Sequence, residues 1–540
     1  MQEPGPFERV LQTDASPQRD RAAIIIVATG IALGLLMLVL VLPPISILDN
    51  GRGCGSVRGP VTATVRAEMP PIPAGYEAVS ALYDLTSQEP IDCPATLGGQ
   101  LTSQQPVDEE LFLYTYQNEA WRQLGTATAS ADGKAASGDV NSLPGNVAVF
   151  RKGEVARSVL GALPIDGELD QNALGTLTTL NPRGYTLDGD GSISGALSAL
   201  PDNLGVALAP TITADDADVL GSILSSDTGR AAHVEEIVAL VNDNGYAGID
   251  LDYRALGAQD GDGFATFVAA LSEQLRQANR TLTMTLLAPV RQGADWDTRG
   301  LAWETLAPLV DAIKVVPAGD PGTYYTTLSD ALGYLVPRVG SRKLYVTIDS
   351  LSREQSSEGV RSLTLTGALT LASTPAVLGD APVDSGAAVS AYGQNLSEQS
   401  GGSLLHWDDT AKAVTFTYTG GGGQRSVWLA NAFSESFKLD LAKRYQLGGV
   451  AIEDVSTGAS DSNVLAAVAR YAASGTVELV EPNGQLLQPR WTASGGTLES
   501  DTGPDVTWTA PSDAGDYILT LIVSDGAIRL GQQLRLSVGS

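Results

Sequence analysis

Short apolar runs alternate with amphipathic stretches through the centre of the chain, from about residue 153 to 475. Runs such as "AGIDLDY" (247–253) and "RKLYVTID" (342–349) have the length and composition of buried strands. The stretch "AAHVEEIVALVNDNG" (231–245) carries apolar residues at the i, i+3, i+4 and i+7 spacing of a helix that covers a sheet. Repetition of this unit predicts an α/β fold, and the length favours a (β/α)8 barrel.

An open, doubly wound sheet is the alternative to the barrel. No glycine-rich phosphate loop follows any of the strand-like runs, which disfavours it. A long insertion, about 355–427, separates the expected seventh and eighth strands. Its alternating "AVTFTYT" (413–419) predicts a strand within a small α+β module on the barrel rim, where barrels place binding residues.

The two flanks of the barrel have β patterns. Residues 60–152 contain "ELFLYTYQNEAWRQLG" (110–125), two strand-like runs about a polar turn, and predict a small β-sandwich-like domain. Residues 476–540 contain "GDYILTLIVSDG" (515–526), in which apolar side chains alternate strictly. Together with Trp491 and Trp508, this tail resembles an immunoglobulin-like or PKD-like sandwich, and the resemblance implies a spacer or adhesion module.

Residues 22–42 carry no charge over 21 positions. At ~1.5 Å per residue this length matches a hydrocarbon core of ~30 Å, and predicts an uncleaved transmembrane helix. A buried core helix is the alternative, but a helix of that kind normally shows a polar stripe. Three arginines precede the span and two follow it, which favours a single-pass protein of the cell membrane with a cytoplasmic tail (1–21). A linker (43–59) and an extracytoplasmic remainder follow.

The net charge and the cysteine content limit the kinds of partner and ligand expected for the chain. The chain has 33 Lys and Arg against 62 Asp and Glu, a net charge of −29. Nucleic acid is therefore not an expected partner, because such binding depends on cationic side chains. The only cysteines, Cys54 and Cys93, could form a disulfide or remain free thiols. They cannot build a metal site alone, and we expect neither a metal nor a cofactor.

The strand at 247–253 holds the candidate chemistry. Asp250 and Asp252 are two residues apart and point to the same side, as does Arg254, two residues further on. We expect Arg254 to pair with one of the two carboxylates. Paired charges inside a strand indicate a functional site, with a purely structural role as the alternative.

The segment "YAGIDLDYR" (246–254) resembles the fourth-strand signature of glycoside hydrolase family 18, Asp-Gly-φ-Asp-φ-Asp-x-Glu, where φ is apolar. "GFATFVAALSEQLRQANRTLTMTLLAPV" and "VWLANAFSESFKLDLAKRYQLGGVAIEDV" are similar to the chitinase-like, spore-germination branch of that family, which is directed at peptidoglycan. The resemblance implies that Asp250 and Asp252 match the two inner aspartates. Ala247 then replaces the first Asp, and Arg254 replaces the catalytic Glu.

The resemblance implies a mechanism in which the substrate's acetamido oxygen attacks the anomeric carbon while the Glu protonates the leaving oxygen. A guanidinium, with a pKa above ~12, cannot supply that proton. Loss of a general acid removes about 10²- to 10⁴-fold of rate. The run "IKVVPAG" also lacks the family's tyrosine after the sixth strand, and Glu453 stands where a tryptophan usually lines the sugar site. Whether the chain is an enzyme is left open, with a degenerate, non-hydrolytic barrel favoured.

Three functions follow. The first is a membrane-anchored protein that binds cell-wall or surface glycan, or serves as a surface scaffold, without hydrolysis. The second is an active hydrolase of N-acetylglucosamine polymers, peptidoglycan or chitin, with a relocated acid; the third is a protein–protein component of an envelope assembly. The strand ends supply the residues expected to bind ligand, of which the last three are also candidates for the relocated acid: Tyr253, Asp349, Glu453 and Asp454.

Overall fold

The computed structural model describes seven parts of the chain: residues 45–48, 61–73, 75–87, 95–153, 157–201, 203–379 and 382–539. The predicted transmembrane helix at 22–42 lies outside these parts, and so do Cys54 and Cys93. Within them, no helix combines the length and the apolar character needed to cross a membrane.

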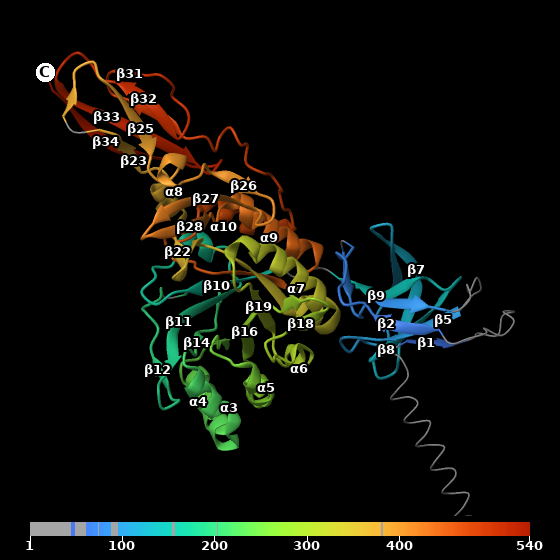
Figure 1. The fold of residues 1–540 in the computed structure, drawn as a ribbon. Helices are drawn as coiled ribbons and strands as arrows, with labels where there is room; N and C mark the ends of the chain where they lie inside the picture. The colour runs from blue at the N-terminus through green and yellow to red at the C-terminus, as the bar shows by residue number, and fades with distance from the viewer. Residues whose placement is uncertain are drawn as a thin grey trace, which may run out of the picture.

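Eight parallel strands form a closed barrel at the centre of the molecule (Figure 1). Closure is direct, because β10 pairs in parallel with both β11 and β29. The predicted (β/α)8 barrel is therefore confirmed, and the alternative of an open sheet is wrong. In chain order the strands are β10 (Ser158–Leu163), β11 (Thr179–Leu187), β14 (Thr211–Thr213), β15 (Gly248–Asp252), β16 (Thr281–Leu287), β19 (Ala312–Val316), β20 (Leu344–Ile348) and β29 (Gly449–Ile452).

Helices surround the barrel and bury their apolar faces on it. Helix α5 (Gly261–Gln277) buries Phe264, Phe267, Val268, Leu271 and Leu275, all at helical spacing. The other helices that accompany the barrel strands are α2 (Gln171–Leu174), α3 (Ala217–Ser225), α4 (Asp227–Asp243), α6 (Trp303–Leu306), α7 (Tyr324–Val339), α9 (Ala432–Arg444) and α10 (Ser462–Ser474).

An antiparallel β region precedes the barrel and lies beside it, in blue in Figure 1. It is fastened to the barrel: the carboxylate of Glu77 accepts hydrogen bonds from Arg151 at 2.8 Å and from Arg342 of the barrel at 3.0 Å. Side chains of this region, including Phe112 and Phe150, share the barrel's hydrophobic core. The main strands are β2 (Thr62–Val65), β3 (Tyr76–Ala78), β4 (Tyr83–Thr86), β5 (Ala95–Gln100), β6 (Leu111–Gln117), β7 (Ala120–Ala129), β8 (Ala135–Val140) and β9 (Asn146–Lys152).

The insertion after β20 supplies strands to two groups of sheets. One is a five-stranded sheet on the barrel: β21 (Ser352–Ser356), β22 (Gly359–Leu363), β26 (His406–Asp408), β27 (Ala413–Gly420) and β28 (Gly423–Trp428). The other combines α8 (Leu365–Ala372) and three strands of the insertion with the tail: β23 (Pro375–Val377), β24 (Val383–Asp384) and β25 (Ala388–Gly393).

The tail strands are β30 (Arg490–Ala493), β31 (Thr497–Leu498), β32 (Asp505–Thr509), β33 (Gly515–Ser524) and β34 (Arg529–Gly539). Strand β25 pairs with β32 and β24 pairs with β34, so both tail sheets contain insertion strands. The sequence pattern predicts separate modules for the insertion and the tail. The structure instead gives them a single hydrophobic core, at the upper left of Figure 1.

Candidate functional site

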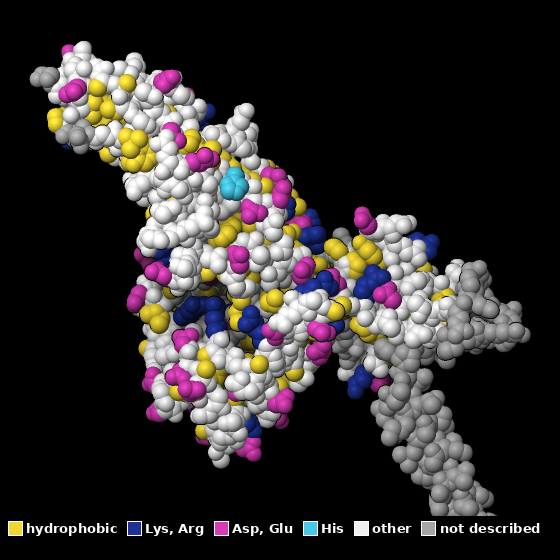
Figure 2. Space-filling view, in the orientation of Figure 1, with side chains coloured by type: hydrophobic (Ala, Val, Ile, Leu, Met, Phe, Trp, Pro, Cys, Tyr) yellow, Lys and Arg dark blue, Asp and Glu magenta, His cyan; other side chains and the backbone are white. Residues whose placement is uncertain are grey.

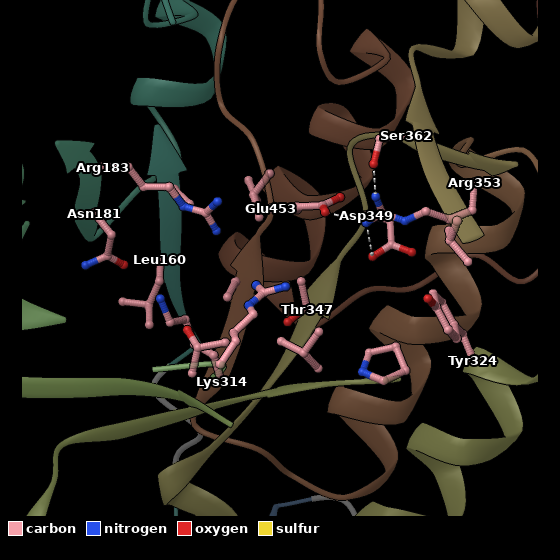
Figure 3. A pocket seen from close by; sticks show the side chains of 18 residues that line it. Leu160, Asn181, Arg183, Lys314, Tyr324, Thr347, Asp349, Arg353, Ser362 and Glu453 are labelled. Atoms are coloured by element: carbon pink, nitrogen blue, oxygen red, sulfur yellow. Dashed lines mark hydrogen bonds and ion pairs between the residues drawn. The ribbon is translucent and has the colours of Figure 1, made fainter. Parts of the chain in front are cut away.

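A cavity of about 200 Å³ opens at the carboxyl ends of the barrel strands (Figure 3). Strand ends and the insertion supply its walls, and Figure 2 shows basic side chains gathered on this face of the barrel. The charged residues that line the cavity are Arg183, Arg254, Lys314, Asp349, Arg353 and Glu453. Three of the residues predicted from the sequence, Arg254, Asp349 and Glu453, are therefore brought together here.

Asp250 lies beneath the cavity and is completely buried. The Nζ atom of Lys314 is 2.7 Å from Asp250 Oδ2. The hydroxyl groups of Thr211 and Thr283 donate to the same carboxylate at 2.8 and 2.7 Å. Lys314 is itself nearly buried, so this ion pair is screened from water and both of its charges are compensated inside the protein.

Asp252, the second aspartate of the strand, lies between two guanidinium groups. Arg254 donates from Nε to Asp252 Oδ1 at 2.8 Å, as expected from their shared face. Arg183 donates from Nη2 to Asp252 Oδ2 at 3.4 Å. Burial lowers the pKa of the Arg254 guanidinium, but the carboxylate of Asp252 outweighs burial and raises this pKa above its ordinary value. Arg254 is thus a permanent cation at the cavity wall.

The opposite wall holds a network of carboxylates and cations. Asp349 accepts from Lys438 Nζ at 2.7 Å, and Glu453 forms an ion pair with Arg353. Burial raises the pKa of the neighbouring Glu435 to about 7. Burial alone would lower the pKa of Lys438, but the carboxylates of Asp349 and Glu435 raise it to about 12. Figure 3 shows Asp349 and Arg353 across the cavity from Arg183.

Two of the predicted ligand-binding residues lie elsewhere. The hydroxyl group of Tyr253 is hydrogen-bonded to His233 Nε2 at 2.6 Å in the shell between barrel and helices. Tyr253 and Arg254 also border a separate pocket of about 30 Å³. The Asp454 carboxylate accepts from the backbone and hydroxyl of Ser456, at 2.8 and 2.6 Å, and does not line the cavity.

Three basic residues of the cavity were missed by sequence reasoning: Arg183, Lys314 and Arg353. For Lys314 there was a signal, since a lysine within the apolar run "AIKVV" of a buried strand requires an interior partner. Arg183 and Arg353 lie in polar surroundings that give no such signal. Across the described part of the chain, no three His, Cys, Asp or Glu side chains are grouped so that they could hold a metal ion.

The arrangement of charges in the cavity favours some kinds of ligand over others. Its cavity offers hydrogen-bond donors from guanidinium groups, and its two strand aspartates are already engaged by cations. Such a site can bind acceptor-rich or anionic groups. The carboxylates in and beneath the cavity, those of Asp250, Asp252, Asp349 and Glu453, each form an ion pair with a lysine or arginine.

Comparison with known proteins shows which family the barrel resembles. Residues 214–457 match the model of glycosyl hydrolases family 18. A curated relative is the YdhD protein of Bacillus subtilis (strain 168), whose name describes a sporulation-specific glycosylase; it is 23% identical over 139 aligned positions, and the alignment covers 24% of this chain. The chain spans about a third of that relative's length, 33%.

Two solved structures align with the chain at low sequence identity. A chitinase from Chromobacterium violaceum ATCC 12472 aligns with a TM-score of 0.46 and 17% identity, covering 59% of this chain and 99% of that one. The spore cortex-lytic enzyme SleL of Bacillus megaterium QM B1551 aligns with a TM-score of 0.46 and 16% identity, covering 63% of this chain and 79% of that one.

Proposed function

We propose that this chain, whose centre is a glycoside hydrolase family 18-like barrel, binds a cell-envelope glycan at the barrel mouth without hydrolysing it. The observation that carries the proposal is the position of Arg254, whose Nε lies 2.8 Å from Asp252 Oδ1. In the family signature this position holds the Glu that protonates the leaving oxygen. A guanidinium held as a cation by Asp252 cannot donate that proton.

The partner of Asp250 supports the same conclusion. In the family mechanism the neighbouring aspartates hold the substrate's acetamido group and tune the acid by like-charge repulsion. Here Lys314 compensates the charge of Asp250 from 2.7 Å, and two threonine hydroxyl groups donate to the same carboxylate. The Asp250 carboxylate is therefore already bound by groups of the protein and is not free to hold a substrate's acetamido group.

The test asks whether the protein is retained on the glycan polymer without releasing sugars from it. The full chain, purified in mild detergent, is mixed with insoluble peptidoglycan or chitin, and the pellet and the soluble sugars are measured. We expect the protein in the pellet and no released sugar. Tyr324→Ala, which removes an aromatic ring from the cavity wall, should weaken retention, whereas Tyr392→Ala in the insertion strand β25 is the matched control. Failure to bind either polymer would overturn the proposal.

A hydrolase with a relocated acid is the second candidate. Glu453 lines the cavity, and its Oε2 atom is buried without a hydrogen-bond partner among the described residues. Its other oxygen is engaged by Arg353. If this carboxyl group were the acid, the wild-type chain would release sugars and Glu453→Gln would abolish the release. Stable protein partners captured with no glycan retained would instead favour a role in an envelope assembly.

The proposed location follows from the N-terminal sequence. Residues 22–42 would anchor the chain with its N-terminus in the cytoplasm, and the barrel and the immunoglobulin-like tail would lie outside. Protease added to intact cells should then digest the barrel and leave a short membrane-bound fragment. Protection of the barrel in intact cells, with digestion only after lysis, would reverse the orientation.

A further inference from the structure

We infer that the barrel mouth recognises a single carboxylate group on an acidic sugar, an inference that rests on the proposed glycan binding and specifies the class of glycan. Two guanidinium groups, those of Arg183 and Arg254, approach different oxygens of Asp252. Two positive charges thus share one negative charge. This wall of the cavity, which we call the arginine pair, has an excess charge of +1 and is complementary to one anionic group.

The arginine pair is accessible and has donors to spare. The side chain of Arg254 is 48% exposed and that of Arg183 is 35% exposed. Asp252 occupies Nε of Arg254 and Nη2 of Arg183, and neither guanidinium donates to any other group within the described residues. A guanidinium carries five N–H donors, so several remain for a ligand. Both side chains line the cavity, so these donors are available to a ligand bound there.

The surroundings favour one negative charge over several. Glu453, on the same cavity, is close enough to act electrostatically on Arg254. A phosphate monoester carries about −1.5 to −2 at pH 7 and would exceed the excess charge of the arginine pair. The net charge of −29 also opposes highly charged polyanions. A carboxylate, with a single charge and a planar shape that fits a guanidinium, is the best match.

The volume of the cavity limits the ligand. About 200 Å³ is less than the ~300–1,000 Å³ that encloses a whole drug-sized molecule, so the cavity takes one sugar residue of a longer glycan. Tyr324 on the wall supplies a ring for the apolar face of a sugar. A sugar residue with one carboxylate therefore satisfies both the charge and the volume of the site.

The experiment compares two ligands that differ in one group. The probes are a disaccharide of glucuronate and N-acetylglucosamine, and the same disaccharide with its carboxylate reduced to an alcohol. Affinity for the full chain is measured by titration calorimetry or ligand-observed NMR. We expect the acidic disaccharide to bind about tenfold more tightly than the reduced one, and we expect that preference to shrink with added salt.

Variants assign the preference to the arginine pair. Arg183→Gln should reduce the preference, and it removes only a long contact to Asp252. The triple variant Arg183→Gln, Asp252→Asn and Arg254→Gln should abolish it; because both guanidinium groups and their shared carboxylate are lost together, no unpaired buried charge is left. Arg535→Gln, at an exposed position of β34, removes the same charge far from the cavity and should leave the preference unchanged.

Each other result would overturn the inference. Equal binding of the two disaccharides would exclude carboxylate recognition and leave glycan binding intact. A preference that persists in the triple variant would place the anion site elsewhere. If neither disaccharide binds, the inference fails, and retention on the insoluble polymers decides the proposed function separately.

Discussion

Lys314 places its Nζ atom 2.7 Å from Asp250 Oδ2, inside the barrel, where the aspartate is completely buried. The two residues come from strands separated by β16 in the barrel, β15 and β19. Each of these buried charges is stabilised by the other, because a charge without a partner in the protein interior has a high desolvation cost. The ion pair therefore leaves neither of these two buried charges without a partner.

Removing one partner of this pair should destabilise the barrel. We expect Lys314→Met to lower the free energy of unfolding by about 3–5 kcal/mol, because Asp250 would remain buried and unpaired. Urea unfolding followed by tryptophan fluorescence measures the effect. The double variant Lys314→Met with Asp250→Asn removes both charges and should recover much of the loss. A single variant as stable as the wild type would show that Asp250 is solvated.

Restoring the family's acid should not restore hydrolysis. In Arg254→Glu a carboxyl group replaces the guanidinium beside Asp252, but Asp250 stays paired with Lys314 and Glu453 stays paired with Arg353. We expect no release of reducing ends from chitin or peptidoglycan, and weaker binding of acidic sugars. Asp252→Asn serves as the control that removes a charge without adding an acid. Turnover by Arg254→Glu alone would show that the other departures from the family pattern are harmless.

His233 should make stability depend on pH. Burial lowers the pKa of its imidazole to about 4, from 6.5. Below pH 6.5 the unfolded chain binds a proton that the folded chain does not, so stability is present above this pH and is lost as the pH falls toward 4. We expect this residue to account for a loss of about 2–3 kcal/mol between pH 7 and pH 4.5.

The measurement is the difference in unfolding free energy between the wild type and His233→Phe at several pH values. As the pH falls, the wild type should lose stability relative to the variant, because the variant has no group to protonate at this position. His406→Phe, which removes the other histidine of the chain, controls for the substitution itself. A difference that stays constant from pH 7 to pH 4.5 would mean that His233 titrates equally in the folded and unfolded chains.

Sequence reasoning could reach the barrel because its signals are local. The helical spacing of Phe264, Phe267 and Leu271 is set within one element, and helix α5 is found where this pattern predicts it. The face shared by Asp252 and Arg254 is equally local, since it follows from the two-residue period of a strand. These features could therefore be predicted without knowledge of the fold.

The partners of the site residues could not be predicted in the same way. Lys314 lies 64 residues from Asp250, and Arg183 lies 69 residues from Asp252. Only the order and register of the strands bring these charges together. The shared core of insertion and tail has the same cause, because nothing in the pattern of Ala388–Gly393 identifies β32 as its partner. Strand patterns give the faces of a strand but not its neighbours.

A buried polar contact should hold the tail against the barrel. Asn431, which caps helix α9, donates from Nδ2 to Asp525 Oδ2 at 3.0 Å, and both residues are completely buried. Asp525 Oδ1 also accepts from the backbone N–H groups of Ala527 and Ile528. In Asp525→Ala these donors lose their acceptor, so we expect about 2–4 kcal/mol of lost stability and faster amide hydrogen exchange around 525–528 and at the start of α9.

Asp513→Ala is the matched control, because it removes an exposed carboxylate from the same tail. It should leave exchange at the start of α9 unchanged. If Asp525→Ala speeds exchange only in its own loop, the contact serves the loop and the tail is held by its apolar core alone. If exchange at Asn431 and the following residues rises together with that of the loop, the tail and the barrel are coupled through this hydrogen bond, and a ligand that tightens the barrel mouth should slow exchange in both places.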